Sequence, residues 1–479
     1  MAREKMSSVD LAWLRMDSPQ NLMMIVGVEI FEQPVPYAGL RSLLETRLLK
    51  FSRFSQKVEM DATGASWVDD DDFDLDHHLV VHELPAPSDE SQMQEFVGLL
   101  ATQPLDEGRP LWQMHLVEGY RGSNAIVTRI HHCIADGMAL IGVLMSLMDG
   151  GQAPPDKKPR EDIEPNPWAP FIKPVTKGTI KAIQSTGFAM SKSMEIFAQP
   201  DRLVDYAQIA SQVIKDITKI ALMPNDSVTR FKGKPGLAKR VAWNKPLPLD
   251  EVKAVAKAMG ASVNDVLLSC VSGAMRRYLI EHGDNTADVE IRAMVPVNLR
   301  GANNTHHLGN QFGLVPMCLP VGEANPVKRV FTVRSRMNEL KSGFQAMLAF
   351  KVLGLVGLAP KPVQTQVLDM LSRKATAVMT NVPGPNYPIK LGGSTVSQIL
   401  FWVPQSGDIG MGVSILSYNG CVQFGLMTDA GLVPDPQKVI DFFEPEFDRL
   451  VYALAMIPSA QLLTENLNSD EIEQQLFGH

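Results

Sequence analysis

The apolar residues in the first third of the chain recur at two different spacings, which predict alternating strands and helices. Short apolar runs typical of β-strands occur at Met24–Phe31, Gln113–Glu118 and Ala125–His131. Apolar residues at helical spacing occur at Leu40–Leu48 and Gln92–Thr102. This alternation indicates an α/β or α+β first domain that ends near Gly150.

The apolar pattern is interrupted after this domain. Residues 151–175 are rich in proline, lysine and acidic residues, which is typical of a linker or crossover. Two helical stretches follow between residues 179 and 223, and the second carries apolar residues at helical spacing. We therefore predict a proline-rich linker and a helical crossover over residues 151–235.

A second series of elements begins near Arg240 with the pattern of a strand, a helix, a turn and another helix. Strand-like runs then recur in the stretches IRAMVPVNLR, LVPMCLP, VMTNVPGP, MGVSILSYNG and CVQFGLMTD. A chain of 479 residues is too long for one core, because single cores stop growing near ~250–300 residues. We therefore predict domains at residues 1–150 and 236–479, with a ligand cleft between them.

Composition excludes some classes of function. The formal net charge of −8 leaves no basic surplus to neutralise phosphates, which argues against a nucleic-acid binder. The four cysteines form no CxxC pair, so they indicate neither a disulfide framework nor a zinc site, and a reducing compartment is expected. The acidic run Asp69–Asp72 is interpreted as a solvated turn rather than a metal site.

Neither a leader nor a membrane span is expected from the sequence. The N-terminal stretch has no apolar segment followed by a small-residue cleavage site. The most apolar stretch, residues 344–360, is broken by Lys351 and falls short of the ~20 residues needed to cross a bilayer. We therefore expect a soluble or peripheral protein.

The most specific chemical signal is the stretch HHCIADG at residues 131–137. It follows a strand-like run and precedes an apolar helix, so it lies at a strand-to-helix corner. Neighbouring side chains of a strand point to opposite faces, so one of His131 and His132 faces a reactant and the other is structural. The same geometry counts against a shared metal ion, and we predict no metal site.

Each residue of this motif also has an ordinary structural explanation. A single histidine in an apolar setting is more often a hydrogen-bonded core residue than a catalyst. Asp136 is a suitable N-cap for the following helix, and Gly137 gives the backbone room to turn. It is the complete pattern HHxxxDG at such a corner that favours a catalytic site.

The chain resembles the bacterial wax ester synthase/acyl-CoA:diacylglycerol acyltransferase family, within the acyltransferases that share HHxxxDG. The resemblance also rests on stretches in family order: PLW at 110–112, ND at 264–265, NLR at 298–300, GNQFG at 309–313 and NVPGP at 381–385. It runs from about residue 7 to residue 460, although residues 151–223 match no motif of the family. It implies a two-domain α/β fold like that of chloramphenicol acetyltransferase, with the active-site tunnel between the domains.

Transfer of an acyl group from a thioester to an alcohol requires removal of the hydroxyl proton. A neutral imidazole with a pKa near ~6.5 suits that role at cytoplasmic pH, and His132 is our candidate general base. No GxSxG elbow occurs, so a serine acyl-enzyme is not indicated. Cys133 is disfavoured as a nucleophile because it would point away from His132. The resemblance implies direct attack in a ternary complex.

Other roles follow from the resemblance. Asp136 would pair with Arg300 and hold the loop, and supporting residues would be His131, Gly137, Asn298 and Arg300. Candidate contacts to the substrate or its oxyanion are Thr380, Asn381, Asn264 and Asp265. Asp265 also fits a capping box with Ser262, which we favour over substrate contact at that position.

Several further residues have competing interpretations. The pairs His77-His78 and His306-His307 lack a following DG, so we interpret both as non-catalytic. Arg276 and Arg277 lie on a predicted helix and could meet cofactor phosphates, although exposed arginines without such a role are commoner. Trp112 is expected to pack beneath the site.

The predicted function is transfer of a fatty acyl group from acyl-CoA to a long-chain alcohol, a diacylglycerol or both. Acyl-CoA is then a substrate, and no bound cofactor is expected. Two alternatives stay open at this point: a condensation-domain-like acyltransferase, which acts on carrier-bound acyl groups, and a non-catalytic lipid-binding protein of the same fold. Such apolar substrates imply a cytoplasmic protein associated peripherally with a membrane or lipid inclusions.

Overall fold

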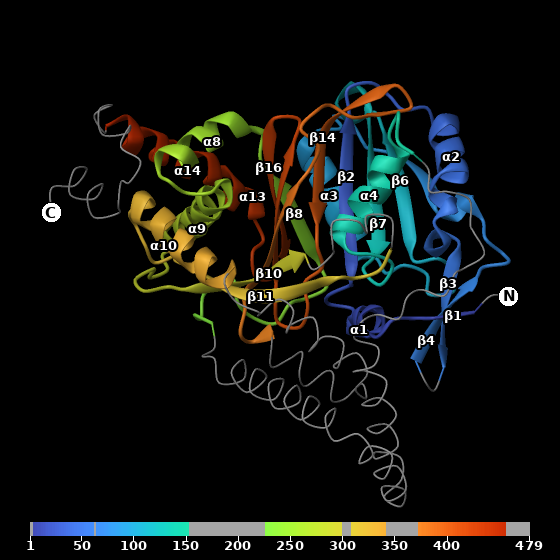
Figure 1. Ribbon diagram of the computed structural model, residues 1–479, viewed down its shortest axis with the longest axis horizontal. Coiled ribbons are helices and arrows are strands. Elements are labelled where there is room, and N and C mark those ends of the chain that lie inside the picture. The colour runs from blue at the N-terminus through green and yellow to red at the C-terminus, as the bar shows by residue number, and fades with distance from the viewer. Residues whose placement is uncertain (1–2, 62–63, 153–225, 299–307, 342–371, 457–479) are drawn as a thin grey trace, which may run out of the picture.

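The computed structural model describes residues 3–61, 64–152, 226–298, 308–341 and 372–456. In these residues the chain forms two large β-sheets, and a group of helices covers the second sheet at one end of the molecule (Figure 1). The predicted α/β class is therefore confirmed. The linker and helices predicted between residues 153 and 225 lie outside the described residues.

The first sheet has six strands and contains the motif strand. Their spatial order is β13 (Lys390–Leu391), β14 (Ser394–Trp402), β2 (Met24–Phe31), β7 (Asn124–His131), β6 (Trp112–Glu118) and β5 (Leu79–Glu83). The helices of this half are α1 (Ser8–Met16), α2 (Tyr37–Thr46), α3 (Glu90–Thr102) and α4 (Gly137–Leu147). A small sheet lies at the outer end, in the order β1 (Glu4–Lys5), β4 (Gly64–Asp69) and β3 (Gln56–Asp61).

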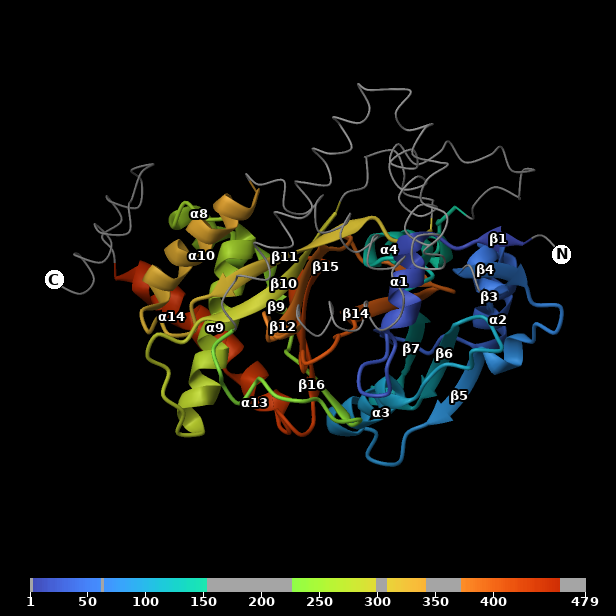
Figure 2. The ribbon, with the colours of Figure 1, turned by 90° about the horizontal axis from the view of Figure 1, so that it is seen from below.

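The second sheet has seven strands. Its order is β11 (Phe312–Leu319), β10 (Ile291–Asn298), β12 (Ala377–Pro383), β15 (Met411–Tyr418), β16 (Cys421–Asp429) and β8 (Lys239–Trp243), and β9 (Leu247–Pro248) also pairs with β16. Its helices are α8 (Leu249–Ala258), α9 (Val263–Glu281), α10 (Pro326–Lys341), α13 (Pro436–Asp441) and α14 (Phe443–Ala455). Figure 2 shows α9, α10 and α14 on the side of this sheet away from the first half.

The two halves exchange structure across the predicted domain boundary. Strands β13 and β14 come from the C-terminal part of the chain, yet β14 pairs antiparallel with β2 in the first sheet (Figure 1). Apolar side chains of β2, α3, β8 and β14 form one buried cluster that joins the halves. The division at residues 150 and 236 therefore does not describe the first sheet, whose edge comes from the second half.

Local sequence explains where the helices near the motif begin. The Asp136 carboxylate accepts a hydrogen bond from the Ala139 backbone N–H at 3.0 Å and so caps α4, as predicted. Ser262 and Asp265 form the predicted capping box of α9, with the Ser262 N–H donating to Asp265 Oδ2 at 2.8 Å. Both caps satisfy N–H groups that a helix start leaves without partners.

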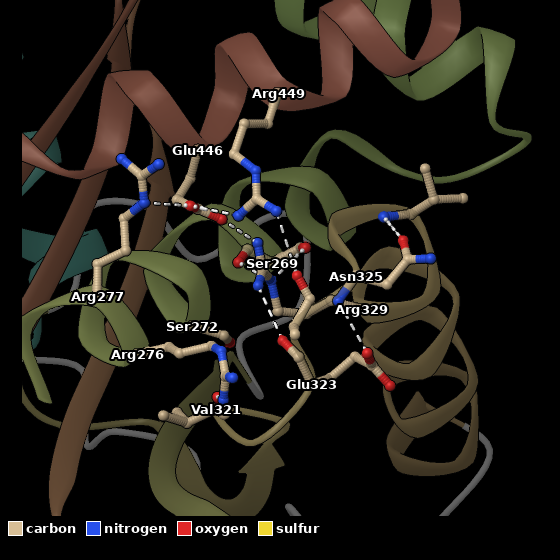
Figure 3. Close-up of polar contacts among 12 residues, drawn as sticks. Ser269, Ser272, Arg276, Arg277, Val321, Glu323, Asn325, Arg329, Glu446 and Arg449 are labelled. Atoms are coloured by element: carbon tan, nitrogen blue, oxygen red, sulfur yellow. Dashed lines mark hydrogen bonds and ion pairs between the residues drawn. The ribbon is translucent and has the colours of Figure 1, made fainter. Parts of the chain in front are cut away.

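The helix layer of the second half is joined by a buried cluster of charges (Figure 3). Glu446 of α14 is fully buried and accepts hydrogen bonds from Arg329 and, at 2.9 Å, from Arg449. The Arg277 Nε lies 2.9 Å from the same carboxylate. Position 273 is a glycine, and a methyl group there would overlap the side chains of Glu446 and Arg329. This ion network therefore fixes α9, α10 and α14 against one another.

Long apolar helices are few in the described part of the chain. No single helix there is long and apolar enough to span a bilayer. Helices α8 and α9 reach that length and apolar composition only when taken together, and they are bent by 99° relative to each other. Helix α9 is largely buried in the core of the second half.

Candidate active site

The motif loop connects β7 to α4 at the junction of the two halves. Its first histidine, His131, lies opposite Met24 at the end of β7. The His132 backbone N–H donates to the Met23 carbonyl at 2.7 Å, which extends the pairing by one residue. The loop then ends at Asp136, the N-cap of α4. The sequence thus placed the motif correctly at a strand-to-helix corner.

His131 holds the loop in shape. Its Nδ1 accepts a hydrogen bond from the Cys133 backbone N–H at 3.1 Å. Burial lowers its pKa to about 3, so the ring is neutral and the 3.9 Å approach of its Nε2 to Asp17 Oδ1 is not an ion pair. The contacts of His131 are those of the structural member of the histidine pair.

His132 lies in an aromatic setting. Its ring stacks on Trp13 of α1, with centroids 4.2 Å apart and planes 13° apart, and Phe312 lies 5.5 Å away. The residue is only 4% exposed, and this burial lowers its pKa to about 4, although Asp136 and Asn310 act in the opposite direction. The expectation of an ordinary imidazole pKa was wrong because it ignored desolvation. The ring is uncharged at neutral pH.

A segment of the second half holds the motif loop from outside. Asn310 Nδ2 donates to the His132 carbonyl at 2.8 Å and to Asp10 Oδ1 at 2.7 Å. The Gln311 backbone N–H donates to Asp136 Oδ2 at 2.9 Å. Gly309 pairs with Ala135 and has a φ of +109°, which disfavours other residues. We call residues 309–311 the latch, because they bind the loop through both backbone and side chain.

This latch could not be predicted directly from the sequence. The stretch GNQFG was noted only as a family motif, and Asp10 and Trp13 only as part of an opening pattern. Both oxygens of Asp136 have partners: one caps α4, as predicted, and the other accepts from the Gln311 N–H of the latch. Arg300, the predicted partner, lies outside the described residues. Asn298 is the last residue of β10, and its backbone lies opposite Phe312.

An apolar cavity lies between the first sheet and α4. Its lining includes Ile130 and Gly137, which flank the motif loop, while the His132 ring is not part of the described lining. The second half contributes residues from the NVPGP stretch and from β15, namely Val382, Gly384, Pro385 and Leu416. A cavity of hydrocarbon walls built by both halves suits a long alkyl chain.

The candidate residues of the second half fall on two faces of β12. Thr380 and Val382 share one face, because side chains alternate along a strand, and Val382 lines the cavity. The Thr380 hydroxyl is buried and has no hydrogen-bond partner among the described residues. Asn381 faces the other way and its Nδ2 donates to Asn264 Oδ1 at 2.6 Å. Thr380 is therefore the better placed of these residues to meet a substrate.

The remaining chemical candidates have structural roles. Burial raises the pKa of the Cys133 thiol, which disfavours it as a nucleophile. His78 stacks between Phe73 and Trp112, and Trp112 packs in the core as predicted. His306-His307 lies outside the described residues.

The two arginines considered for phosphate contact have other partners. Arg276 Nη1 donates to Thr286 Oγ1 at 2.6 Å and to the Gly322 carbonyl at 2.9 Å. Arg277 belongs to the Glu446 network. Among the described residues no group of three or more metal-ligating side chains is close enough to hold a metal ion.

Two family models cover most of the chain. The model of the wax ester synthase/diacylglycerol acyltransferase catalytic domain matches residues 6–267 and therefore includes the HHxxxDG loop. The C-terminal domain model of the same family matches residues 308–451, which include the latch. The chain belongs to this family. By that membership it is an O-acyltransferase, and the resemblance seen in the motifs is confirmed.

Relatives and solved structures agree with this assignment. A Mycobacterium tuberculosis protein named as a diacylglycerol O-acyltransferase is 28% identical over 457 residues, covering 93% of this chain and 95% of that protein. The wax ester synthase/diacylglycerol acyltransferase of Marinobacter aquaeolei has a similar fold, with a TM-score of 0.65, 21% identity, and coverage of 93% and 98% of the two chains. A condensation domain of the calcium-dependent antibiotic synthetase matches with a TM-score of 0.59 at 15% identity, covering 98% of each chain, which reflects the shared fold alone.

Proposed function

We propose that this acyltransferase moves a fatty acyl group from acyl-CoA to the hydroxyl of a long-chain alcohol or a diacylglycerol, with His132 as the general base. The observation that carries the proposal is a neutral imidazole on a loop whose flanking residues line an apolar cavity. The mycobacterial relatives named as diacylglycerol O-acyltransferases support the acceptor class. Acyl-CoA is a substrate in this scheme, and the chain needs no bound cofactor.

The reaction balances without a covalent enzyme intermediate. His132 takes the proton of the acceptor hydroxyl as its oxygen bonds to the thioester carbon. The carbonyl oxygen becomes an oxyanion, for which the Thr380 hydroxyl is the candidate donor. The carbon–sulfur bond then breaks, and the CoA thiolate takes the proton from the imidazolium. Burial disfavours the imidazolium, so proton return to the leaving sulfur is favoured.

Mixing the purified protein with palmitoyl-CoA and hexadecanol or diacylglycerol tests the proposal. The expected result is release of free CoA thiol that requires an acceptor, together with the matching wax ester or triacylglycerol. A mixture of the two acceptors gives the preference between them. A protein that binds acyl-CoA and releases no thiol with either acceptor would instead be a lipid-binding protein of this fold.

The low pKa of His132 sets the acid side of the pH profile. We expect kcat/KM to stay nearly constant from about pH 7 down to about pH 5, because the base becomes protonated only near pH 4. If the base were an exposed histidine, the enzyme would already lose half of its activity near pH ~6.5. Initial rates at saturating acyl-CoA and limiting acceptor give the profile. A midpoint at pH 6 or above would contradict the burial of this ring during turnover.

The same histidines make the fold sensitive to acid. Folded-state pKa values of about 3 for His131 and about 4 for His132 lie below the unfolded value, so the unfolded chain binds more protons as the pH falls below ~6.5. Stability therefore falls as the pH is lowered through this range. Rates below pH 6 need a parallel measurement of folding by circular dichroism.

The contacts of the latch predict that Asn310 supports catalysis without touching the substrate. In Asn310→Ala the His132 carbonyl and the Asp10 carboxylate lose their common donor, and we expect kcat to fall by about 10²-fold through misplacement of the imidazole. Asn285→Ala, in an exposed loop of the same half, is the matched control and should behave as the unaltered protein. A rise in KM with an unchanged kcat would contradict a positioning role for Asn310.

We further propose that the protein works in the cytoplasm at the surface of a membrane or lipid inclusion. Its acceptors are poorly soluble in water, and an apolar chain reaches the cavity most easily from such a surface. The segments considered for docking, residues 179–223 and 344–360, lie outside the described residues. Flotation with triacylglycerol-filled vesicles, compared with protein alone, tests the association.

A further inference from the structure

One carboxyl group lies in the wall of the apolar cavity. Ile25, Gly27 and Glu29 alternate along β2 and face the cavity, while Val26 and Val28 face the opposite core. The wall is otherwise almost entirely hydrocarbon, with the Thr128 side chain on the neighbouring strand as a second polar group. Glu29 is 8% exposed, so its side chain is buried from bulk solvent while it borders the cavity.

Among the described residues, none other than Glu29 itself supplies a partner for this carboxyl. No described side chain donates a hydrogen bond to Glu29 or forms an ion pair with it, and the contact that favours its charged form comes from its own backbone N–H. Its cross-strand neighbours are the apolar residues Ile126 and Ile399. A buried polar group without a partner destabilises a protein, so the fold alone does not explain Glu29.

Burial also decides which form of the acid faces the cavity. Desolvation raises the pKa of Glu29 to about 8, so the group carries its proton at neutral pH. A protonated carboxyl offers one O–H donor and one carbonyl acceptor. Gly27, the next residue on the same face, has no side chain to cover it. The arrangement presents a neutral hydrogen-bonding group to whatever fills the cavity.

The position of Glu29 defines which part of a ligand it would meet. The Met23 carbonyl, one residue before β2, accepts a hydrogen bond from the His132 backbone N–H, and Glu29 lies six residues further along the chain, within β2. At ~3.3 Å per residue the backbone of Glu29 is about 20 Å from that of Met23, which lies beside the motif loop. A chain that lies along β2 with its reacting group beside the motif loop therefore passes Glu29 near its far end.

We propose that this cavity binds a long alkyl chain that carries a hydroxyl group near its far end, and that Glu29 binds this hydroxyl. The inference rests on the proposed function, because it takes the cavity as the site of the chain being transferred or of the accepting alcohol. Both sources present the same chemistry, an oxygen at the distal end of an otherwise apolar chain. Glu29 is then a specificity-determining residue.

The test compares hydroxylated and plain substrates in two arms. In the first, ω-hydroxypalmitoyl-CoA and palmitoyl-CoA are each offered with hexadecanol. In the second, palmitoyl-CoA is offered with 1,16-hexadecanediol or with hexadecanol. The ratio of kcat/KM for the hydroxylated over the plain compound is measured in each arm. The arm in which the ratio depends on Glu29 identifies which of the two chains occupies the cavity.

Two variants separate hydrogen bonding from shape. Glu29→Leu removes both hydrogen-bonding functions, and we expect the ratio to fall about tenfold in one arm, as for loss of one neutral hydrogen bond. Glu29→Gln keeps a donor and an acceptor of nearly the same size, and the ratio should fall by less than about threefold. Thermal melting of both variants confirms that they fold.

The outcomes also distinguish this inference from the proposed function. Equal ratios for the unaltered protein and Glu29→Leu in both arms, with plain substrates turned over, would overturn the role of Glu29 alone. Failure of the unaltered protein to release CoA thiol from any pair of substrates would overturn the proposed function. A larger fall in Glu29→Gln than in Glu29→Leu would also contradict hydrogen bonding to a distal hydroxyl.

Discussion

Replacing His132 by alanine is expected to lower kcat by about 10²–10⁴-fold, because in the proposed mechanism the acceptor hydroxyl then has no base in position. The measurement is release of free CoA thiol from palmitoyl-CoA and hexadecanol at neutral pH. Loss of the ring also removes the stacking partner of Trp13, so the circular dichroism spectrum and thermal midpoint are recorded beside the rates. The acyl-CoA KM should change little compared with kcat.

His77→Ala is the matched control for this variant. His77 belongs to the other described histidine pair, is exposed and lies away from the HHxxxDG loop, so its loss should leave the rate unchanged. Full activity in His132→Ala with a normal fold would contradict general-base catalysis by this residue. The family assignment would still hold, since it rests on matches over most of the chain.

Replacing Glu446 by leucine lowers the free energy of unfolding by about 3–5 kcal/mol, the largest stability effect that we expect. Glu446 and Arg329 are both fully buried, so loss of the carboxylate leaves a guanidinium without a countercharge. Arg277 and Arg449 lose the same partner but reach solvent. Urea unfolding followed by tryptophan fluorescence measures the change.

Glu444→Leu is the control on the same helix, because its side chain is exposed and its loss should change stability by less than about 0.5 kcal/mol. The double variant Arg329→Met/Glu446→Leu tests the cause. Removing both charges should restore much of the lost stability, since no uncompensated charge remains. A double variant less stable than Glu446→Leu would show that the network stabilises by geometry rather than by charge balance.

Much of the fold could be predicted from periodicity. The three strand-like runs of the first third correspond to β2, β6 and β7, and the helix pair after Arg240 corresponds to α8 and α9. The corner position of the motif and both helix caps were predicted from local sequence, because each depends on residues within a few positions of one another. Such short-range features are what a sequence pattern can report.

What the sequence did not predict depends on distant residues. The latch joins Asn310 to Asp10 and His132, which are 300 and 178 positions away in the chain. The pKa of His132 follows from its burial by Trp13 and Phe312, which no spacing rule reveals. Glu29 was an unremarked residue in an apolar strand, and only the cavity gives it a chemical interest.

The pairing of β14 with β2 bears on how this polypeptide is made. A nascent chain that has emerged only as far as residue 300 carries β2 with one edge unpaired, since its neighbour β14 lies about 370 residues later in the chain. An apolar strand with an open edge is a template for aggregation. The first sheet can therefore be completed only after residues 394–402 are synthesised. The first half produced alone would leave the same edge without its neighbour.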